Sequence, residues 1–186
     1  SVLSAQRRIA TLATDGTINL SDIDNGSLAR SYSLTPAAPA VAAPAIPASG
    51  PAGPITSAAM TGSSLVVAGD GGIAVWDTLR GERVASGKPS SGDIKAVAWL
   101  GSADRIAAAG GDGHLAVFAR DTLAQVQRSA DSHNDAVTAM VAIPGRNIVA
   151  SASSDKTVKV WNSETLSLVR TYRGHNGPVG ALDATS

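Results

Sequence analysis

The sequence predicts an all-β fold, arranged as a tandem array of small antiparallel sheets. An aspartate stands six residues ahead of a strand-ending position in four similar segments, and these aspartates (Asp15, Asp70, Asp112 and Asp155) are 55, 42 and 43 residues apart. A period of about 42 residues that combines a turn and a strand is typical of repeat proteins. No segment has a sustained 3.6-residue apolar pattern, so we expect little helix.

The unit that ends at Tyr172 shows the repeat most clearly. Its apolar runs at 136–142, 148–153, 157–161 and 166–172 are separated by turn residues. Four short strands joined by short turns predict an antiparallel meander. The same pattern predicts strands in the three preceding units, at 8–14, 17–22 and 28–34; at 55–60, 64–69, 72–77 and 82–86; and at 94–99, 105–110, 114–119 and 123–129.

The second and third strands of each unit are apolar at most positions, whereas a strand that is covered on one face alternates apolar and polar residues. Each sheet is therefore expected to lie between two neighbouring sheets. The chain is 44% hydrophobic but only 3% aromatic, so Ala, Val, Ile and Leu must form this core. Small side chains of this kind suit closely stacked sheets.

The units give expected boundaries along the chain. A proline- and alanine-rich segment interrupts the array and holds six of the nine prolines. Its composition excludes a central strand or a helix, so we expect an extended loop insertion, with a docking segment for a proline-recognising partner as the alternative. The expected parts are unit 1 (1–34, with a truncated first strand), the insertion (35–54), unit 2 (55–87), unit 3 (88–130), unit 4 (131–173) and the start of a further unit (174–186).

These units resemble the WD40-repeat β-propeller family, whose blades are four-stranded sheets that tend to carry a Gly-His pair and a terminal Trp-Asp pair. Gly174-His175 and Trp76-Asp77 match these pairs, and Trp161-Asn162 is a degenerate form. The resemblance implies a β-propeller built of four-stranded antiparallel WD-type blades, here a partial ring of about four. The ring could be completed by more of the same polypeptide, by another chain, or by the segment 178–186 pairing beside unit 1.

The resemblance also implies a buried hydrogen-bond network in each complete blade. Unit 4 can supply all four members, which are His133, Ser151, Asp155 and Trp161. The other units are incomplete: unit 3 has Ala108 and Phe118 at two of these places, unit 2 has Val66 with Trp76, and unit 1 has Thr11 with Ser21. Unit 4 is therefore expected to be the most rigid.

Motifs for catalysis or metal binding do not stand out in the sequence. The chain has no cysteine, and two of its three histidines, His133 and His175, hold equivalent places in successive units, which favours a structural role. His114 follows a tight turn and is expected to be an exposed residue at the start of a strand. The Gly-Asp-Gly segments lack the helix and lysine of a phosphate loop and are interpreted as hairpin turns. We therefore expect no enzyme activity, no cofactor and no metal.

The predicted function is a non-catalytic scaffold for protein–protein interactions within a larger intracellular complex, cytoplasmic or nuclear, with no membrane association. Its partners are expected to be several other proteins. The candidate partner-binding residues are Thr14, Lys88, Asn134, Asp135, Ser154 and Lys156. The alternative is an RNA-contacting structural subunit of a ribonucleoprotein machine, which the zero net charge does not favour. Its candidate contacts are Arg7, Arg8, Arg146, Lys156, Lys159, Arg170 and Arg173.

Overall fold

A computed structural model describes residues 8–12, 17–22, 28–33, 54–70, 72–88, 93–101, 104–143 and 145–184. The candidate residue Thr14 and nearly all of the insertion expected at 35–54 lie outside these residues. The chain divides into two compact units, Ser1–Gly50 and Pro51–Ser186, which are described separately.

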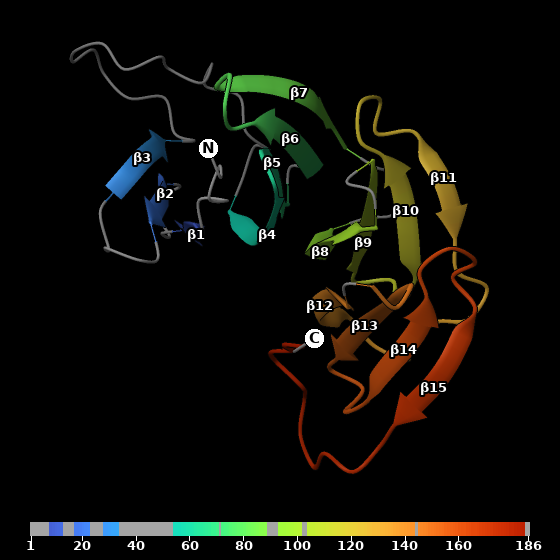
Figure 1. The fold of residues 1–186 in the computed structure, drawn as a ribbon. Helices are drawn as coiled ribbons and strands as arrows, with labels where there is room; N and C mark the ends of the chain where they lie inside the picture. The colour runs from blue at the N-terminus through green and yellow to red at the C-terminus, as the bar shows by residue number, and fades with distance from the viewer. Residues whose placement is uncertain are drawn as a thin grey trace. The chain divides into compact units, whose positions relative to one another are not determined.

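The described residues form fifteen strands and no helix (Figure 1). Sheet 1, in the first unit, contains β1 (Arg8–Leu12), β2 (Thr17–Asp22) and β3 (Leu28–Ser33). Sheet 2 contains β4 (Ile55–Thr61), β5 (Ser64–Gly69), β6 (Gly72–Asp77) and β7 (Glu82–Gly87). Sheet 3 contains β8 (Ile94–Leu100), β9 (Arg105–Gly110), β10 (Leu115–Ala119) and β11 (Gln125–Arg128). Sheet 4 contains β12 (Val137–Ile143), β13 (Ile148–Ser153), β14 (Val158–Asn162) and β15 (Leu168–Tyr172).

The all-β prediction and the antiparallel meanders are confirmed. Consecutive strands pair in chain order in every sheet, because short turns let each strand pair with the one just before it. Five expected strands, 17–22, 64–69, 72–77, 105–110 and 148–153, have the bounds that the sequence predicts. The others differ by up to two residues at an end, most often where turn residues follow the apolar run.

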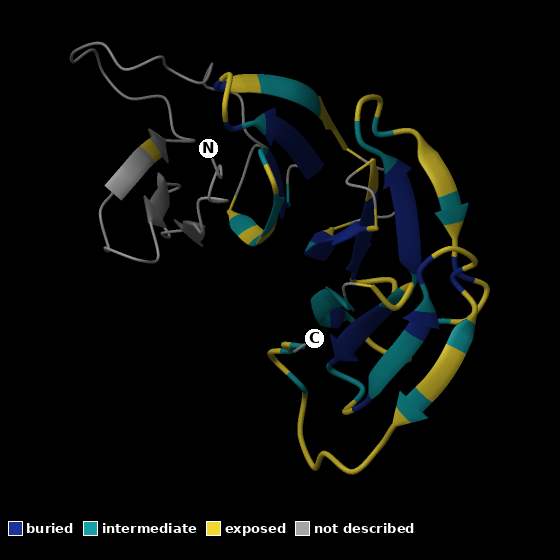
Figure 2. Ribbon diagram, viewed as in Figure 1, coloured by how far each residue is buried: buried dark blue, intermediate teal, exposed yellow. Residues whose placement is uncertain are grey.

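A β-bulge interrupts the pairing of the last two strands in all four sheets. In sheet 4 it lies between Val160 and Trp161, and in sheet 2 between Val75 and Trp76. The last strand is the outer edge of each sheet, and a bulge there twists the strand and limits pairing with another chain. The outer strands of sheets 2 to 4 are also the more exposed ones, whereas β5, β6, β9 and β10 are dark blue (Figure 2).

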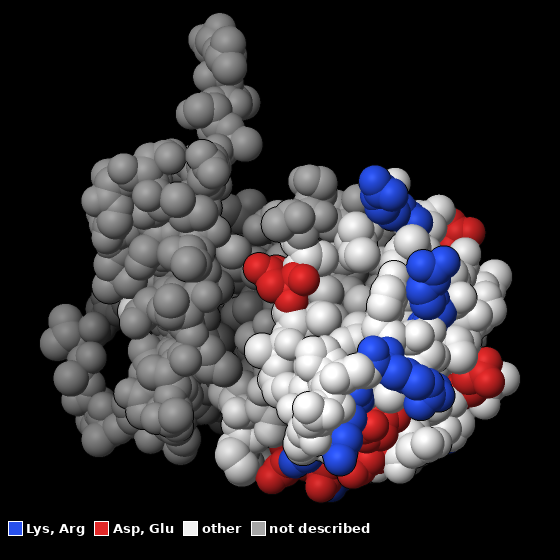
Figure 3. Space-filling view, turned by 90° about the horizontal axis from the view of Figure 1, so that it is seen from below, with Lys and Arg blue, Asp and Glu red and all other residues white. Residues whose placement is uncertain are grey.

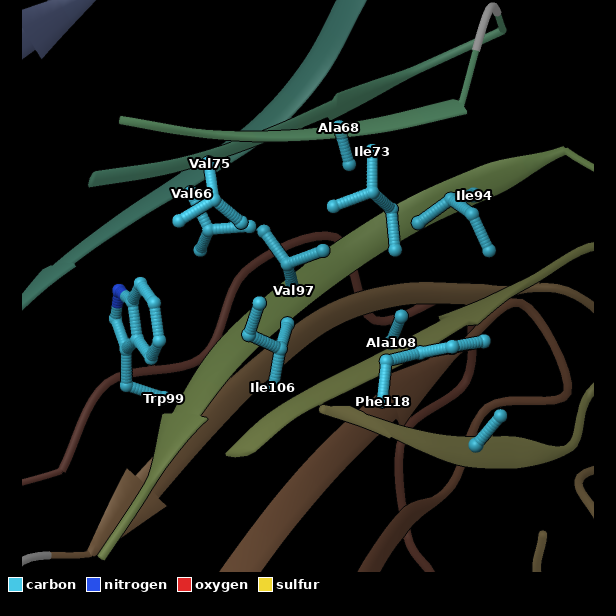
Figure 4. Packing of buried hydrophobic residues seen from close by; sticks show 11 residues of the cluster. Val66, Ala68, Ile73, Val75, Ile94, Val97, Trp99, Ile106, Ala108 and Phe118 are labelled. Atoms are coloured by element: carbon cyan, nitrogen blue, oxygen red, sulfur yellow. The ribbon is translucent and has the colours of Figure 1, made fainter. Parts of the chain in front are cut away.

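The core of residues 54–184 lies between the sheets rather than within any one of them. Side chains of sheet 2, such as Val66 and Val75, pack against Val97, Trp99 and neighbouring side chains of sheet 3 (Figure 4). A second cluster joins sheet 3 to sheet 4. Each buried Val, Leu or Ile contributes about 1.5–3 kcal/mol relative to full exposure, so this face-to-face stacking is the main stabilising feature. The three sheets of residues 54–184 do not close a ring.

Two leucines in the turns before the outer strands adopt left-handed backbone conformations. Leu123 has φ 52° and Leu166 has φ 52°, at the place where sheet 2 has Gly81 with φ 72°. Leu166 is only 1% exposed and belongs to the cluster between sheets 3 and 4, and Leu123 packs against the preceding cluster. Burial of these side chains offsets the backbone strain, which is about 1–2 kcal/mol for a non-glycine residue.

The first strands β4, β8 and β12 lie next to one another, and hydrogen bonds link β4 to β8. Thr56 Oγ1 donates to the carbonyl of Ile94 at 2.7 Å, across the junction of sheets 2 and 3. On sheet 4 the equivalent residue, Thr138, donates in the same way to the carbonyl of Val179. The segment after β15 therefore contacts sheet 4 as β8 contacts sheet 2, although it forms no strand in residues 173–184.

In the part of the chain that the structure describes, no helix has the length and apolar character needed to cross a membrane.

Candidate binding surface and its hydrogen-bond network

The four residues proposed for the network in sheet 4 are brought together by the structure. His133 Nδ1 lies 3.0 Å from Asp155 Oδ2, and His133 Nε2 lies 2.8 Å from Ser151 Oγ. Trp161 Nε1 donates to the same serine oxygen at 2.8 Å. The serine hydroxyl therefore donates to Nε2, which places the imidazole proton on Nδ1 facing the carboxylate. The chain of bonds connects the outer loop to the third strand of the sheet.

The carboxylate of Asp155 is the centre of this network. Burial alone would raise its pKa, but hydrogen bonds from Thr157, Asn134 and His133 outweigh burial and hold the pKa well below its ordinary range. Oδ1 accepts from the Thr157 hydroxyl at 2.6 Å and from the Thr157 amide at 2.9 Å. Oδ2 accepts from the backbone N–H of Asn134 at 2.9 Å. Asp155 is therefore ionised at neutral pH and fixes the turn and the loop before β12.

His133 is uncharged in this arrangement. Burial lowers its pKa, the hydrogen bond and the charge of Asp155 act against this, and Lys159 lowers it further. The pKa of an ion-paired histidine would be raised, whereas the net shift here is downward, so the contact with Asp155 is a hydrogen bond between a neutral imidazole and a carboxylate. Lys159 Nζ instead donates to the carbonyl of Ser132 at 2.6 Å.

Sheet 3 anchors the backbone of His133. The His133 amide donates to the carbonyl of Gly113 at 2.9 Å. A Cβ at Gly113 would lie 2.5 Å from the His133 carbonyl oxygen, and the residue has φ 73°, so only glycine fits this close approach. The network of sheet 4 is thus held against the turn of the preceding sheet.

Sheets 2 and 3 hold the equivalent aspartates differently. Asp70 pairs with Lys95 of the next sheet at 3.4 Å, and Asp112 pairs with Arg128 of its own sheet at 3.0 Å. Both pairs are partly solvent-exposed, so each contributes little beyond about 1 kcal/mol. Only sheet 4, among the sheets whose side chains are described, has the buried histidine pair.

The register corrects one sequence assignment. In sheet 4, Ser151 pairs with Lys159, which stands two residues before Trp161. In sheet 2, the residue that stands two before Trp76 pairs with Val67. Val67, and not Val66, therefore stands where Ser151 stands; Val66 faces sheet 3. A one-residue slip in the alignment moves a side chain to the other face of a strand. Because valine offers no acceptor, the buried Trp76 Nε1 has no hydrogen-bond partner among the residues that the structure describes.

The described candidate partner-binding residues share one end of the sheets, which we call the aspartate end. It carries the turns with Asp70, Asp112 and Asp155 and the loops that follow each outer strand. Lys88 ends sheet 2, Asn134 and Asp135 precede β12, and Ser154 and Lys156 flank the network aspartate. These side chains are exposed, except that of Ser154, which is half-buried. Lys156 has φ 68°, at the place where sheet 3 has Gly113.

The remaining histidines and charges show no catalytic or metal-binding arrangement in the described residues. His114 is half-buried rather than exposed, and its Nδ1 lies 3.1 Å from the Ser129 carbonyl. No group of three or more histidines and acidic residues within the described ranges could hold a metal ion. The basic side chains in view are interspersed with acidic ones (Figure 3). Arg170 stacks on Tyr172, with 5.9 Å from its guanidinium carbon to the ring centre.

A cavity at the other end of the sheets escaped the sequence analysis. Its volume is about 420 Å³, and it is bounded by the ends of β4, β8 and β12. Apolar side chains, including Met60, Trp99, Leu100 and Met140, line it together with polar groups. No sequence pattern shows which side chains meet across separate units, so the sequence alone does not indicate this cavity.

Comparison with known proteins agrees with this geometry. The family of the WD domain, G-beta repeat (WD40) matches residues 124–162. Nuclear distribution protein nudF of Aspergillus niger is 45% identical over 53 residues, 28% of this chain and 12% of that protein. Pre-mRNA-processing factor 19 of Mus musculus is 32% identical over 79 residues, 42% of this chain and 16% of that protein. The chain thus spans less than a fifth of either relative.

A solved structure described as the structure of U3-55K superposes with a TM-score of 0.73 at 19% sequence identity. The match covers 92% of this chain and 50% of that chain. At this identity the likeness concerns the fold, which is that of stacked four-stranded sheets.

Proposed function

Because the chain carries a WD40 repeat and folds as blades of a WD-repeat β-propeller, we propose that it is a non-catalytic scaffold that binds other proteins within a larger complex. The observation that carries this proposal is the shared position of exposed polar residues at the aspartate end, on turns fixed by buried sheets. Loops on a rigid support lose little conformational entropy when a partner binds.

Within the proposed surface, the network of sheet 4 fixes the turn that carries Asp155 and the loop before β12. The Asn134 backbone N–H donates a hydrogen bond to the Asp155 carboxylate. Lys156 lies between Asp155 and Thr157, whose backbone N–H and hydroxyl donate to the same carboxylate. The side chains of Asn134 and Lys156 are exposed and free of this bonding role. We propose that Lys88, Asn134, Asp135, Ser154 and Lys156 contact partner proteins.

The similar proteins are consistent with an intracellular role of this kind. Two of them are named for nuclear distribution and for pre-mRNA processing, and a cytoplasmic or nuclear location is part of the proposal. The mixed charges in Figure 3 offer no continuous basic surface in that view, so protein partners are favoured over RNA.

The test is capture of partners from cells of the source organism with the whole chain and with two variants. Asn134→Ala combined with Lys156→Gly removes two exposed side chains, and the glycine also relieves the left-handed backbone of the lysine. Arg146→Ala, in an exposed turn at the other end, is the matched control. Proteins that are lost with the double variant and retained with the control support the proposal. Identical capture by all three chains would contradict it.

A further inference from the structure

The cavity between the first strands reaches both junctions of the sheets, but a large aromatic side chain fills only one of them. Its lining comes from the ends of β4, β8 and β12 and from the turn after β12, which includes Asn147. At the junction of sheets 2 and 3 the first strands are closed by Trp99, which is only 7% exposed. The junction of sheets 3 and 4 has no such side chain, and Met140 and Ala142 there are half-buried.

The sheet registers identify the residue that stands in the place of Trp99. Trp99 pairs with Ile106, and Ile106 in turn pairs with Phe118. In sheet 4 the same path from Trp161 leads through Val149 to Ala142. Both residues face the preceding sheet, since Trp99 belongs to the cluster with sheet 2 and Ala142 packs on the cluster with sheet 3. An alanine thus replaces a tryptophan at the wall of the cavity.

The bonding of Trp99 shows what the empty place could accept. Its indole lies at the end of the buried cluster that contains Val66 and Val97 (Figure 4). Its Nε1 donates to the Ala59 carbonyl at 3.0 Å. Ala59 pairs with Val66 and Ala98 pairs with Ala107, so Ala98 holds the equivalent place on β8. Ala98 also lines the cavity. The repeat therefore offers a second indole-sized place with a carbonyl acceptor.

We propose that this cavity binds a tryptophan side chain of a partner protein, seated as Trp99 is seated one sheet earlier. Its ring would contact Leu100, Met140 and Ala142, and its indole N–H would donate to the Ala98 carbonyl. Methionine suits such a wall, because its flexible side chain adapts to the ring and its sulfur makes favourable contacts with aromatic groups. That the tryptophan belongs to a partner protein rests on the proposed scaffold role. The existence of an indole-binding site does not.

The test uses N-acetyl-tryptophanamide as the probe and the whole 186-residue chain. The chain has only two methionines, Met60 and Met140, and both line the cavity. Methyl-labelled methionine therefore gives two NMR signals. The Met60→Leu variant loses the signal of Met60 and so assigns both. We expect the probe to shift the Met140 signal, with a Kd on the order of 1 mM for a free ligand of this size. N-acetyl-leucinamide and N-acetyl-phenylalaninamide should bind at least tenfold more weakly.

Two variants make the test specific. Ala142→Trp should fill the cavity, raise the melting temperature and weaken probe binding at least tenfold. Val169→Trp, at a side chain that is 59% exposed on the outer strand, adds a tryptophan elsewhere and should leave binding unchanged. Trp99→Ala should open a second site and shift the Met60 signal as well.

The proposal is overturned if the tryptophan probe leaves Met140 unshifted, if the phenylalanine probe binds equally well, or if Ala142→Trp binds the probe like the original chain. Probe binding that persists while the loop variants fail to alter partner capture would reject the proposed partner surface and leave the indole site standing.

Discussion

Replacement of Asp155 by alanine tests the network of sheet 4 most severely. The carboxylate accepts four hydrogen bonds, from His133 Nδ1, the Asn134 amide, and the amide and hydroxyl of Thr157. The His133 side chain is 0% exposed, so once the carboxylate is gone its N–H is left with the longer contact to the Thr157 hydroxyl, whose oxygen lies 3.2 Å from Nδ1. A buried unsatisfied donor costs about 1–3 kcal/mol, whereas the exposed Asn134 amide can bond to water.

We therefore expect Asp155→Ala to lower the free energy of unfolding by about 2–3 kcal/mol. For a chain of this size the melting temperature would fall by roughly 5–10 °C. Thermal and urea unfolding, followed by circular dichroism, measure the change. The matched control is Asp112→Ala, which removes the equivalent turn aspartate with its exposed bond from the His114 backbone N–H and its partly exposed pair with Arg128, and should cost less than about 1 kcal/mol. Equal losses in the two variants would refute the special role of the buried network.

Three further predictions concern individual side chains. Because burial lowers the pKa of His133, the unfolded chain binds a proton more readily below its ordinary value of 6.5; stability should fall as pH drops below that value, and His133→Gln should flatten the decline in melting temperature between pH 7 and pH 5. Val67→Thr should stay within about 0.5 kcal/mol of the original chain, since its hydroxyl gains a buried indole N–H as partner, whereas Val66→Thr should cost about 1–2 kcal/mol; equal costs in urea unfolding would contradict this. Leu166→Ala should lower the free energy of unfolding by about 2–3 kcal/mol through loss of buried contacts, whereas Leu79→Ala, at a side chain that is 67% exposed, should change it very little. Equal losses for the two variants in calorimetry would contradict a stabilising role for the left-handed leucine.

The sequence predicted the strands and their order because local signals determine them. The turn aspartates and glycines recur with the period of the sheet, and the apolar runs between them are as long as the observed strands. The left-handed Leu123 and Leu166 were beyond such signals, because glycine is the residue that a sequence pattern associates with positive φ. Burial between the sheets, which depends on the packed structure, stabilises them there.

The candidate site was only partly predictable for the same reason. His133, Ser151, Asp155 and Trp161 could be proposed together because the resemblance to WD-type blades implies such a network and unit 4 has a residue for each place in it. The cavity depends instead on which residues face each other across units, and that follows from the register.

The central claim is that separate small sheets stack face to face and bury their flanks against each other. Methyl–methyl nuclear Overhauser effects in the labelled chain test it most directly. Cross-peaks from Val66 and Val75 of sheet 2 to Val97 and Ile106 of sheet 3 are expected, because these side chains share one buried cluster. Cross-peaks confined to pairs within one sheet, such as Val66 with Val75, would contradict the stacking and the binding surface that it supports.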